Sequence, residues 1–154
     1  MAFTGVMHIS PGGLDVVDSS AQVGVGTVAQ DGSGNEYKYL QGAASTSAGS
    51  VVIYDEAGVT SLAVADDVGP IAIAQAATIA NTYGWYLING SGSADTADDV
   101  ADNGDVYLTA TPGSVDDAVV AGDRVHGALF RAAGTGASTV AIQLFNPMVD
   151  NIAD

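Results

Sequence analysis

The sequence predicts an all-β protein: a compact β-sandwich or β-barrel of roughly eight to nine short strands with an extended N-terminal arm. Short apolar segments recur along the chain, and Gly, Asp, Asn and Ser separate them. Several of these segments alternate apolar residues with small or polar ones, which is the two-residue period of a strand with one buried face. Two segments, residues 76–81 and residues 114–117, resemble helices. Residues 76–81 are too short to form a stable helix alone.

Each predicted strand is an apolar run bounded by turn-forming residues. Residues 51–54 are a β-branched run that ends at the turn-forming residues 55–58. Pro70 fits the first position of its strand, because proline has no N–H to donate to a ladder. Residues 84–90 are the most strand-like segment, and their apolar residues on both faces allow burial on both sides. The predicted strands are residues 23–27, 37–40, 51–54, 62–64, 71–74, 84–90, 106–111, 125–130 and 139–144.

The segments between these strands contain the turn signals. Residues 31–35, Asp-Gly-Ser-Gly-Asn, predict a tight turn. The Gly-rich residues 132–138 predict a hairpin that joins the last two strands, and the Ala-rich residues 76–81 predict one turn. Residues 114–117 resemble a helix capping box, with Gly122 as a stop signal, so a short helix and a turn both stay open there.

Residues 1–20 break the strand pattern, and we expect them to form an N-terminal arm before a single β domain at residues 21–154. Such an arm can fray. It can also wrap a neighbouring subunit, because an open sheet edge accepts added strands. The first residues have no basic region followed by a long apolar run, so we expect no signal peptide.

The charge balance is strongly acidic. Three basic residues, Lys38, Arg124 and Arg131, face 18 acidic ones, which gives a formal net charge of -15. The chain is nevertheless 47% hydrophobic and only 14% charged, so it has the apolar material for a folded core. Its polar surface consists mainly of Ser, Thr, Asn, Gly and Asp, and we expect it to be soluble and self-repelling.

This composition excludes several classes of function. Nucleic-acid and anionic-lipid binding both need cationic groups, so we expect neither partner. No apolar stretch reaches the roughly 18 residues of a membrane-spanning helix. The chain has no cysteine, which excludes disulfides and thiolate metal sites.

The residues needed for hydrolysis do not form a recognisable motif. A triad needs a nucleophile, a base and an orienting group, and His8 and His126 are the only histidines. His8 lies in the arm, whereas His126 alternates with Arg124 in a predicted strand, so those two side chains share a face. We therefore expect no catalytic residue and no enzyme. A hydrolase that uses His126 is kept as an alternative, and an interface or structural His126 fits the pattern better.

An acidic segment and a glycine-rich segment are the candidates for metal and cofactor binding. Asp98, Asp99, Asp102 and Asp105 cluster around Asn103-Gly104, and clustered carboxylates are what Ca²⁺ prefers. The spacing does not match an EF-hand, so a solvated acidic loop is the expectation and these four residues are the metal candidates. Residues 24–26 lack the third glycine and the following helix of a phosphate-binding loop, and we expect no cofactor.

Several segments together resemble the capsid decoration, or cement, proteins on the heads of tailed bacteriophages. Residues 69–77, Gly-Pro-Ile-Ala-Ile-Ala-Gln-Ala-Ala, run into residues 83–90, Tyr-Gly-Trp-Tyr-Leu-Ile-Asn-Gly. Residues 115–125 and the ending Asn-Pro-Met-Val-Asp at 146–150 fit the same type. The resemblance covers residues 36–150. It implies an all-β homotrimer on the outer surface of an icosahedral head, where it clamps adjacent major capsid subunits.

The resemblance supplies no catalytic residue, so the sequence points to contacts instead. A trimer carries 3 × 15 = 45 formal negative charges, and its copies must meet through neutral surface or pair their few cations with Asp. The interface candidates are Arg124, His126, Arg131, His8 and Lys38.

A second function from a different class stays open. A carbohydrate-binding or host-attachment β module, displayed on the virion, would use Trp85, Tyr83, Tyr107 and the acidic residues 95–105. A solvent-exposed Trp85 would favour it over a core tryptophan.

Overall fold

The computed structural model of the protein describes residues 7–8 and 13–153. Its regular structure over these residues is β throughout, with no helix, so the all-β prediction is confirmed. The strands are β1 (Met7–His8), β2 (Val28–Gln30), β3 (Glu36–Gln41), β4 (Val51–Tyr54), β5 (Thr60–Leu62), β6 (Gly69–Ala74), β7 (Tyr83–Asp95), β8 (Asp105–Leu108), β9 (Val115–Asp116), β10 (Arg124–Phe130) and β11 (Thr139–Val149). Two of these eleven, β1 and β9, have two residues each, which leaves nine longer strands.

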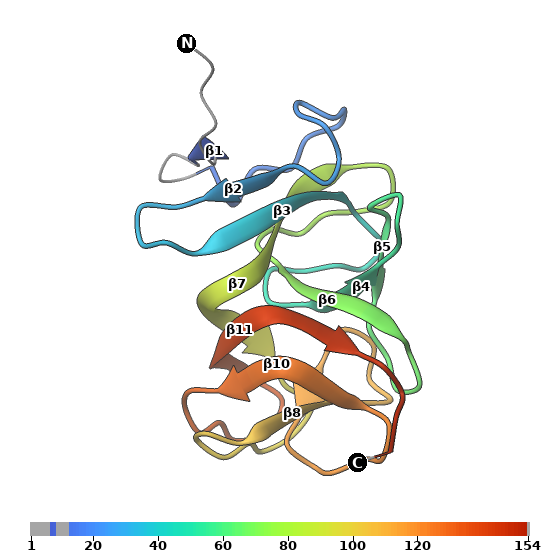
Figure 1. The fold of residues 1–154 in the computed structure, drawn as a ribbon, viewed down its shortest axis with the longest axis vertical. Helices are drawn as coiled ribbons and strands as arrows, with labels where there is room; N and C mark the ends of the chain where they lie inside the picture. Colours follow the sequence, from blue (N-terminus) through green and yellow to red (C-terminus); the bar gives the residue numbers. More distant parts are fainter. Residues whose placement is uncertain (1–6, 9–12, 154) are drawn as a thin grey trace.

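One sheet joins all of these strands and curls back on itself. Strands β2 to β11 pair antiparallel, and β1 adds to β2 in parallel. The first part of β7 pairs with β3 and β6, its second part pairs with β11, and β11 also pairs with β6. Strands β2 and β3 lie at one end of the molecule and β8 and β10 at the other, with β7 and β11 between them (Figure 1). The arrangement is consistent with a β-sandwich or a barrel-like fold.

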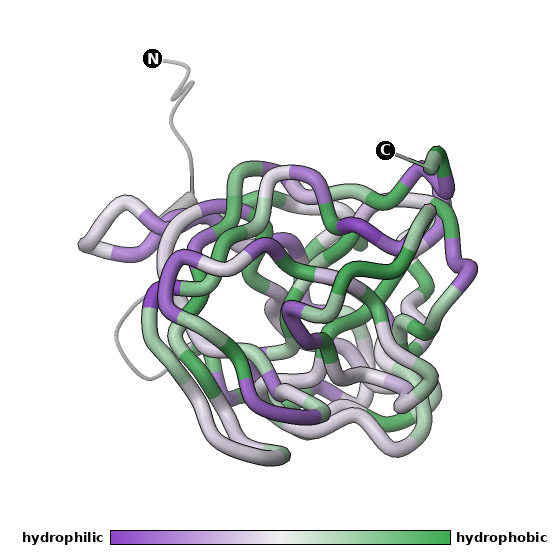
Figure 2. The backbone as a smooth tube through the Cα atoms, turned by 90° about the horizontal axis from the view of Figure 1, so that it is seen from below, coloured by the Kyte–Doolittle hydropathy of each residue, from purple (hydrophilic) through white to green (hydrophobic). Residues whose placement is uncertain are grey.

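The first half of β7 is buried on both faces around residues 86–88, as its apolar residues allow. Leu87 belongs to a main core between the two ends of the curled sheet, and Tyr86 belongs to a second, smaller core on the opposite face. Both side chains are fully buried. Polar and apolar residues alternate at short intervals along the backbone (Figure 2). Such alternation is expected of strands that have one polar and one apolar face. The second core consists of Leu40, Val52, Ala72, Ala74, Tyr86 and Ile88.

Strand β11 changes which of its residues face the main core. Leu144 and Val149 both lie in that core although they are an odd number of positions apart. Asn146 lies between them, and its positive φ of 45° marks the place where the alternation of the strand shifts by one residue. Phe145 and Met148 consequently point away from the main core, and they are 56% and 47% exposed. Two large apolar side chains are thereby placed on the outside of the sheet.

Two expected elements are wrong. The strand expected at residues 23–27 starts only at Val28, because the chain turns at Gly26, at φ 91°, with a hydrogen bond from the Thr27 N–H to the Gly24 carbonyl. The helix or turn expected at residues 114–117 is strand β9. Val115 pairs with Leu108 there and is buried in the main core, so tertiary pairing overrides the capping-box pattern.

The second half of the expected arm lies against the sheet. Asp18 and Tyr83 exchange two backbone hydrogen bonds, each with an N···O distance of 2.9 Å. The Tyr39 hydroxyl donates to the Asp18 carboxylate at 2.5 Å, and Leu14 packs on the main core. Strand β1 adds backbone pairing with Ala29 and Gln30. Arm residues 1–6 and 9–12, and the side chain of His8, lie outside the described residues.

Candidate functional site

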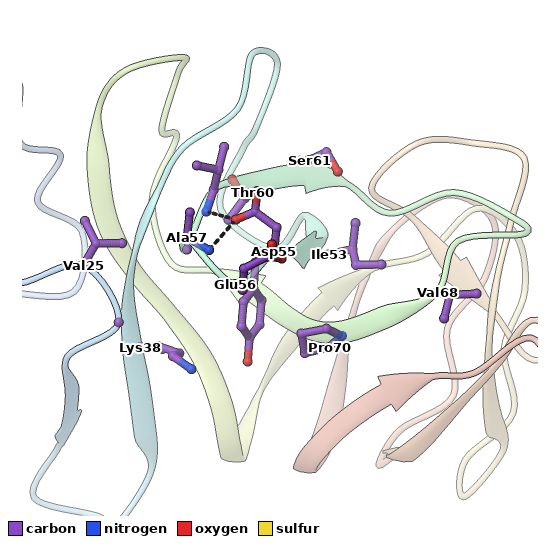
Figure 3. A pocket seen from close by; sticks show the side chains of 14 residues that line it. Val25, Lys38, Ile53, Asp55, Glu56, Ala57, Thr60, Ser61, Val68 and Pro70 are labelled. Atoms are coloured by element: carbon purple, nitrogen blue, oxygen red, sulfur yellow. Dashed lines mark hydrogen bonds between the residues drawn. The ribbon is translucent and has the colours of Figure 1, made fainter.

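A hollow of about 1010 Å³ lies on the outer side of the sheet, beside the β4–β5 hairpin (Figure 3). The hairpin and its turn form one side, Lys38 of β3 and the residues around Gly26 form another, and Val68 and Pro70 at the start of β6 form a third. The lining residues are Val25, Gly26, Lys38, Ile53, Tyr54, Asp55, Glu56, Ala57, Gly58, Val59, Thr60, Ser61, Val68 and Pro70.

The turn of the hairpin is held by its own first residue. The Asp55 carboxylate accepts hydrogen bonds from the Ala57 N–H at 3.0 Å and the Val59 N–H at 2.9 Å, drawn as dashed lines in Figure 3. The Asp55 N–H donates to the Val59 carbonyl at 3.1 Å. Aspartate favours such turns because its side chain bonds the backbone two residues on. This wall of the hollow is therefore preformed.

Gly58 ties the turn to the neighbouring parts of the hollow. Its φ of 76° lies in the left-handed region, where glycine carries no steric cost. A Cβ added at Gly58 would collide with the Val25 side chain, so the loop at residues 24–26 approaches the turn closely. The Gly58 carbonyl also accepts a hydrogen bond from the Gln41 N–H at 2.9 Å. Only glycine satisfies the backbone angle and the close approach together.

Lys38 and Tyr54 face each other across the hollow. The Lys38 Nζ lies 5.0 Å from the centroid of the Tyr54 ring, within the range of a cation–π interaction. Tyr54 also packs on the second core, and burial raises the pKa of its hydroxyl. The tyrosine therefore stays neutral, and the cation is held over its ring.

The rest of the rim combines apolar and acidic side chains. Val59 is 40% exposed and Val68 is 59% exposed, and Pro70 is exposed as well. Asp55 and Glu56 are exposed beside them. The three ionisable side chains of the hollow that carry charge at neutral pH thus sum to one net negative charge. Exposed apolar side chains and acidic groups therefore lie side by side on this rim.

The structure places Arg124 and His126 on one face of β10, as the sequence predicts, and gives each a partner in its own chain. Arg124 Nη2 lies 3.1 Å from the Asp105 carboxylate, and His126 Nε2 lies 3.5 Å from the Asp150 carboxylate. Both pairs are partly exposed. The other two described cations are also engaged: Arg131 donates to Asn103 at 2.7 Å and to Gln143 at 2.8 Å, and Lys38 lies over Tyr54.

The four metal candidates do not converge on one point. The Asp98 carboxylate accepts the Asp99 N–H, the Asp99 carboxylate accepts the Gly136 N–H, and the Asp105 carboxylate binds Arg124. Asp102 is exposed. Across residues 7–8 and 13–153, no group of three or more His, Cys, Asp or Glu side chains lies close enough to hold a metal ion.

The aromatic residues considered for sugar stacking are divided between two strands. Trp85 of β7 is half-buried and lies against Tyr39, with ring centroids 5.1 Å apart. Tyr83 stacks on the same Tyr39 at 6.1 Å. Tyr107 of β8 is buried, and β8 pairs with β9 and β10 rather than with β7. These residues therefore form no shared platform.

The sequence identified the turn at residues 55–58 but missed the hollow beside it. Lys38, Tyr54 and Pro70 belong to three strands that are distant in sequence, and only their register brings them together. The available signal was an isolated lysine between two tyrosines on a predicted strand.

Comparison of the chain with known protein families, known proteins and solved structures gives no match. The described part of the chain contains no helix that is long and apolar enough to cross a membrane.

Proposed function

We propose that the protein is a structural virion protein: a homotrimeric decoration, or cement, protein on the outer capsid surface of a tailed-bacteriophage head. In this role it clamps adjacent major capsid subunits and stabilises the head. The resemblance of residues 36–150 to such proteins supports the proposal, and the all-β fold agrees with what that resemblance implies. The role requires no catalytic residue and no cofactor.

One observation carries the proposal further than the resemblance does. The surface is strongly acidic, yet it exposes large apolar side chains on the outside of the sheet, among them Val68, Phe145 and Met148. Exposed apolar side chains that gather on one surface mark interaction sites. Met148 of β11 is the register partner of the exposed Pro70 of β6, so Met148 and Pro70 lie side by side. A protein that functions by adhering to other proteins needs such a surface.

The charges also bear on how copies of the chain would meet. Each of the described basic side chains already has a partner in its own chain. Copies of the chain therefore meet through neutral surface, or share a partly exposed cation such as Arg124 with an Asp of the neighbouring copy, because their facing charges would otherwise be of one sign. A trimer that touches three capsid sites also binds far more tightly than one subunit, since the second and third contacts are intramolecular.

The sheet edge at β2 supports a role for the N-terminal segment in such contacts. Strand β1 pairs there in parallel, with Met7 opposite Ala29. An edge that accepts an added strand through backbone hydrogen bonds is a common means of joining one protein chain to another.

Light scattering combined with size-exclusion chromatography tests the oligomer, and we expect a mass of three chains. Heads that lack the protein should lose resistance to heat and osmotic shock, and adding the purified protein back should restore it. A strict monomer at high concentration would count against the trimer. Equal resistance of bare and decorated heads would remove the stabilising role.

A further inference from the structure

We propose that the hollow beside the β4–β5 hairpin receives a short segment of another protein that carries apolar and basic side chains. The inference deepens the proposed function and rests on it for the identity of that protein, which would be the major capsid subunit.

The hollow is rigid enough to act as a receptor. Its hairpin turn is held by Asp55 and tied to Gln41 through Gly58, and the Thr60 hydroxyl donates to the Gln41 carbonyl at 2.7 Å. Strand β4 is anchored on β6 by three register pairs, including Val52 with Ala72. A preformed site binds without an ordering cost of its own, which favours affinity.

The lining selects for apolar groups flanked by positive charge. Val59, Val68 and Pro70 expose apolar surface that a partner's side chain would cover. Asp55 and Glu56 stand at the same rim, as Figure 3 shows, and can pair with Lys or Arg of a partner. The hollow's own cation, Lys38, is held over Tyr54, so it opposes such a partner less than a free lysine would.

Charge argues against a second copy of this chain as the occupant. The chain has three basic residues, of which Lys38 is in the hollow itself. Arg124 is paired with Asp105, and Arg131 is bound to Asn103 and Gln143. A second copy would therefore bring acidic surface toward Asp55 and Glu56 at a net charge of -15 per chain. The occupant is a different, more basic protein.

A sugar is a poorer fit than a peptide segment. Sugar rings bind by stacking on an open aromatic face, and the Tyr54 ring has the Lys38 Nζ over it. The exposed apolar side chains of the lining, among them Val25, Val59 and Val68, also suit the side chains of a peptide.

Fluorescence anisotropy with two labelled heptapeptides tests the inference directly. One peptide alternates leucine with arginine and the other alternates leucine with glutamate. We expect the leucine–arginine peptide alone to bind, and Glu56→Gln and Val59→Ser each to weaken it about five- to tenfold. Asp102→Asn and Val119→Ser are the matched controls, since both positions are exposed and neither lines the hollow. The controls should leave the affinity and the melting temperature unchanged.

Several results would overturn the inference. Equal losses in Glu56→Gln and Asp102→Asn would mean that the net charge alone attracts the peptide. No binding, or binding that is insensitive to Val59→Ser, would mean that the hollow is not the site. Dissociation of the oligomer by Val59→Ser would make the hollow a contact between copies of this chain.

The same four variants, added to undecorated heads, separate this inference from the proposed function. If the unaltered protein binds heads and the hollow variants bind equally well, the hollow is not the capsid contact, although the proposed function stands. If the unaltered protein does not bind heads, the proposed function fails, and the peptide assay still decides whether the hollow takes a basic, apolar segment.

Discussion

The Lys38 ammonium lies 5.0 Å from the centroid of the Tyr54 ring, on two strands that do not pair with each other. The contact crosses the outer side of the sheet and joins the β3 side of the hollow to its hairpin side. It also holds one of the chain's three basic residues against an aromatic ring.

Replacing Lys38 should weaken the fold slightly. We expect Lys38→Gln to lower the free energy of unfolding by about 0.5–1 kcal/mol, because the cation–π contact is lost. Urea denaturation measures this, and Lys38→Arg is the control, since a guanidinium keeps both the charge and the contact. A Gln variant as stable as the unaltered protein would show that the contact contributes nothing.

Asp55 should be important for the hairpin turn and not only for its charge. We expect Asp55→Ala to lower the free energy of unfolding by about 1 kcal/mol, because the Ala57 and Val59 N–H groups lose their common acceptor. Asp55→Asn keeps a side-chain oxygen and should retain most of the stability. Chemical denaturation of the pair gives the comparison, and equal losses would assign the effect to charge instead.

Stability should fall between about pH 10 and pH 12 because of two tyrosines. Burial, with Asp31 beside Tyr37 and Asp18 beside Tyr39, raises the pKa of each hydroxyl from 10.0 to about 12. The unfolded chain loses these protons near pH 10 while the folded chain keeps them, so the free energy of unfolding falls as pH rises through this window. Below pH 10 these two groups leave it unchanged.

Denaturation curves at several alkaline pH values measure this decline. Tyr37→Phe and Tyr39→Phe should each make it shallower, because each removes a hydroxyl whose pKa is raised in the folded chain. Tyr54→Phe cannot serve as an unaffected control, because burial raises the pKa of the Tyr54 hydroxyl as well. A slope identical in both Phe variants and the unaltered protein would refute the assignment.

Arg124→Glu should act first within the subunit. The new carboxylate would face Asp105 where the arginine now lies 3.1 Å from it, and we expect the free energy of unfolding to fall by about 0.5–1 kcal/mol. The sequence also predicts that this change weakens trimer assembly. Light scattering of Arg124→Glu beside Arg124→Gln measures that effect, and an unchanged trimer in both would remove Arg124 from the interface.

Much of the fold was predictable because strand signals are local. The β-branched residues 51–54 are β4, residues 31–35 form the expected turn, and residues 132–138 join the last two strands as expected. The two-sided burial of β7 also followed from its apolar residues on both faces. The strand at Val115 was missed because a capping-box pattern describes local preference, whereas this segment pairs with β8 and is buried.

The candidate site was less predictable, and the reason is register. Arg124 and His126 could be assigned to one face, because alternation along a strand is a local property. Their partners Asp105 and Asp150 depend on which strands and which chain end lie beside β10. The surroundings of the acidic residues at 98–105 depend on strand pairing in the same way. Their carboxylates bind separate partners and do not converge on one ion position.

The sequence by itself determined the class of the fold, the acidic surface and the scarcity of basic residues, since composition and two-residue alternation are readable without long-range contacts. The tertiary structure alone decided where the three cations are held, which apolar side chains stay exposed, and that a hollow forms beside β4 and β5. These features depend on pairing between segments distant in the chain. Shifting a strand by one residue would turn its side chains to the opposite face, so register decides what each of them meets.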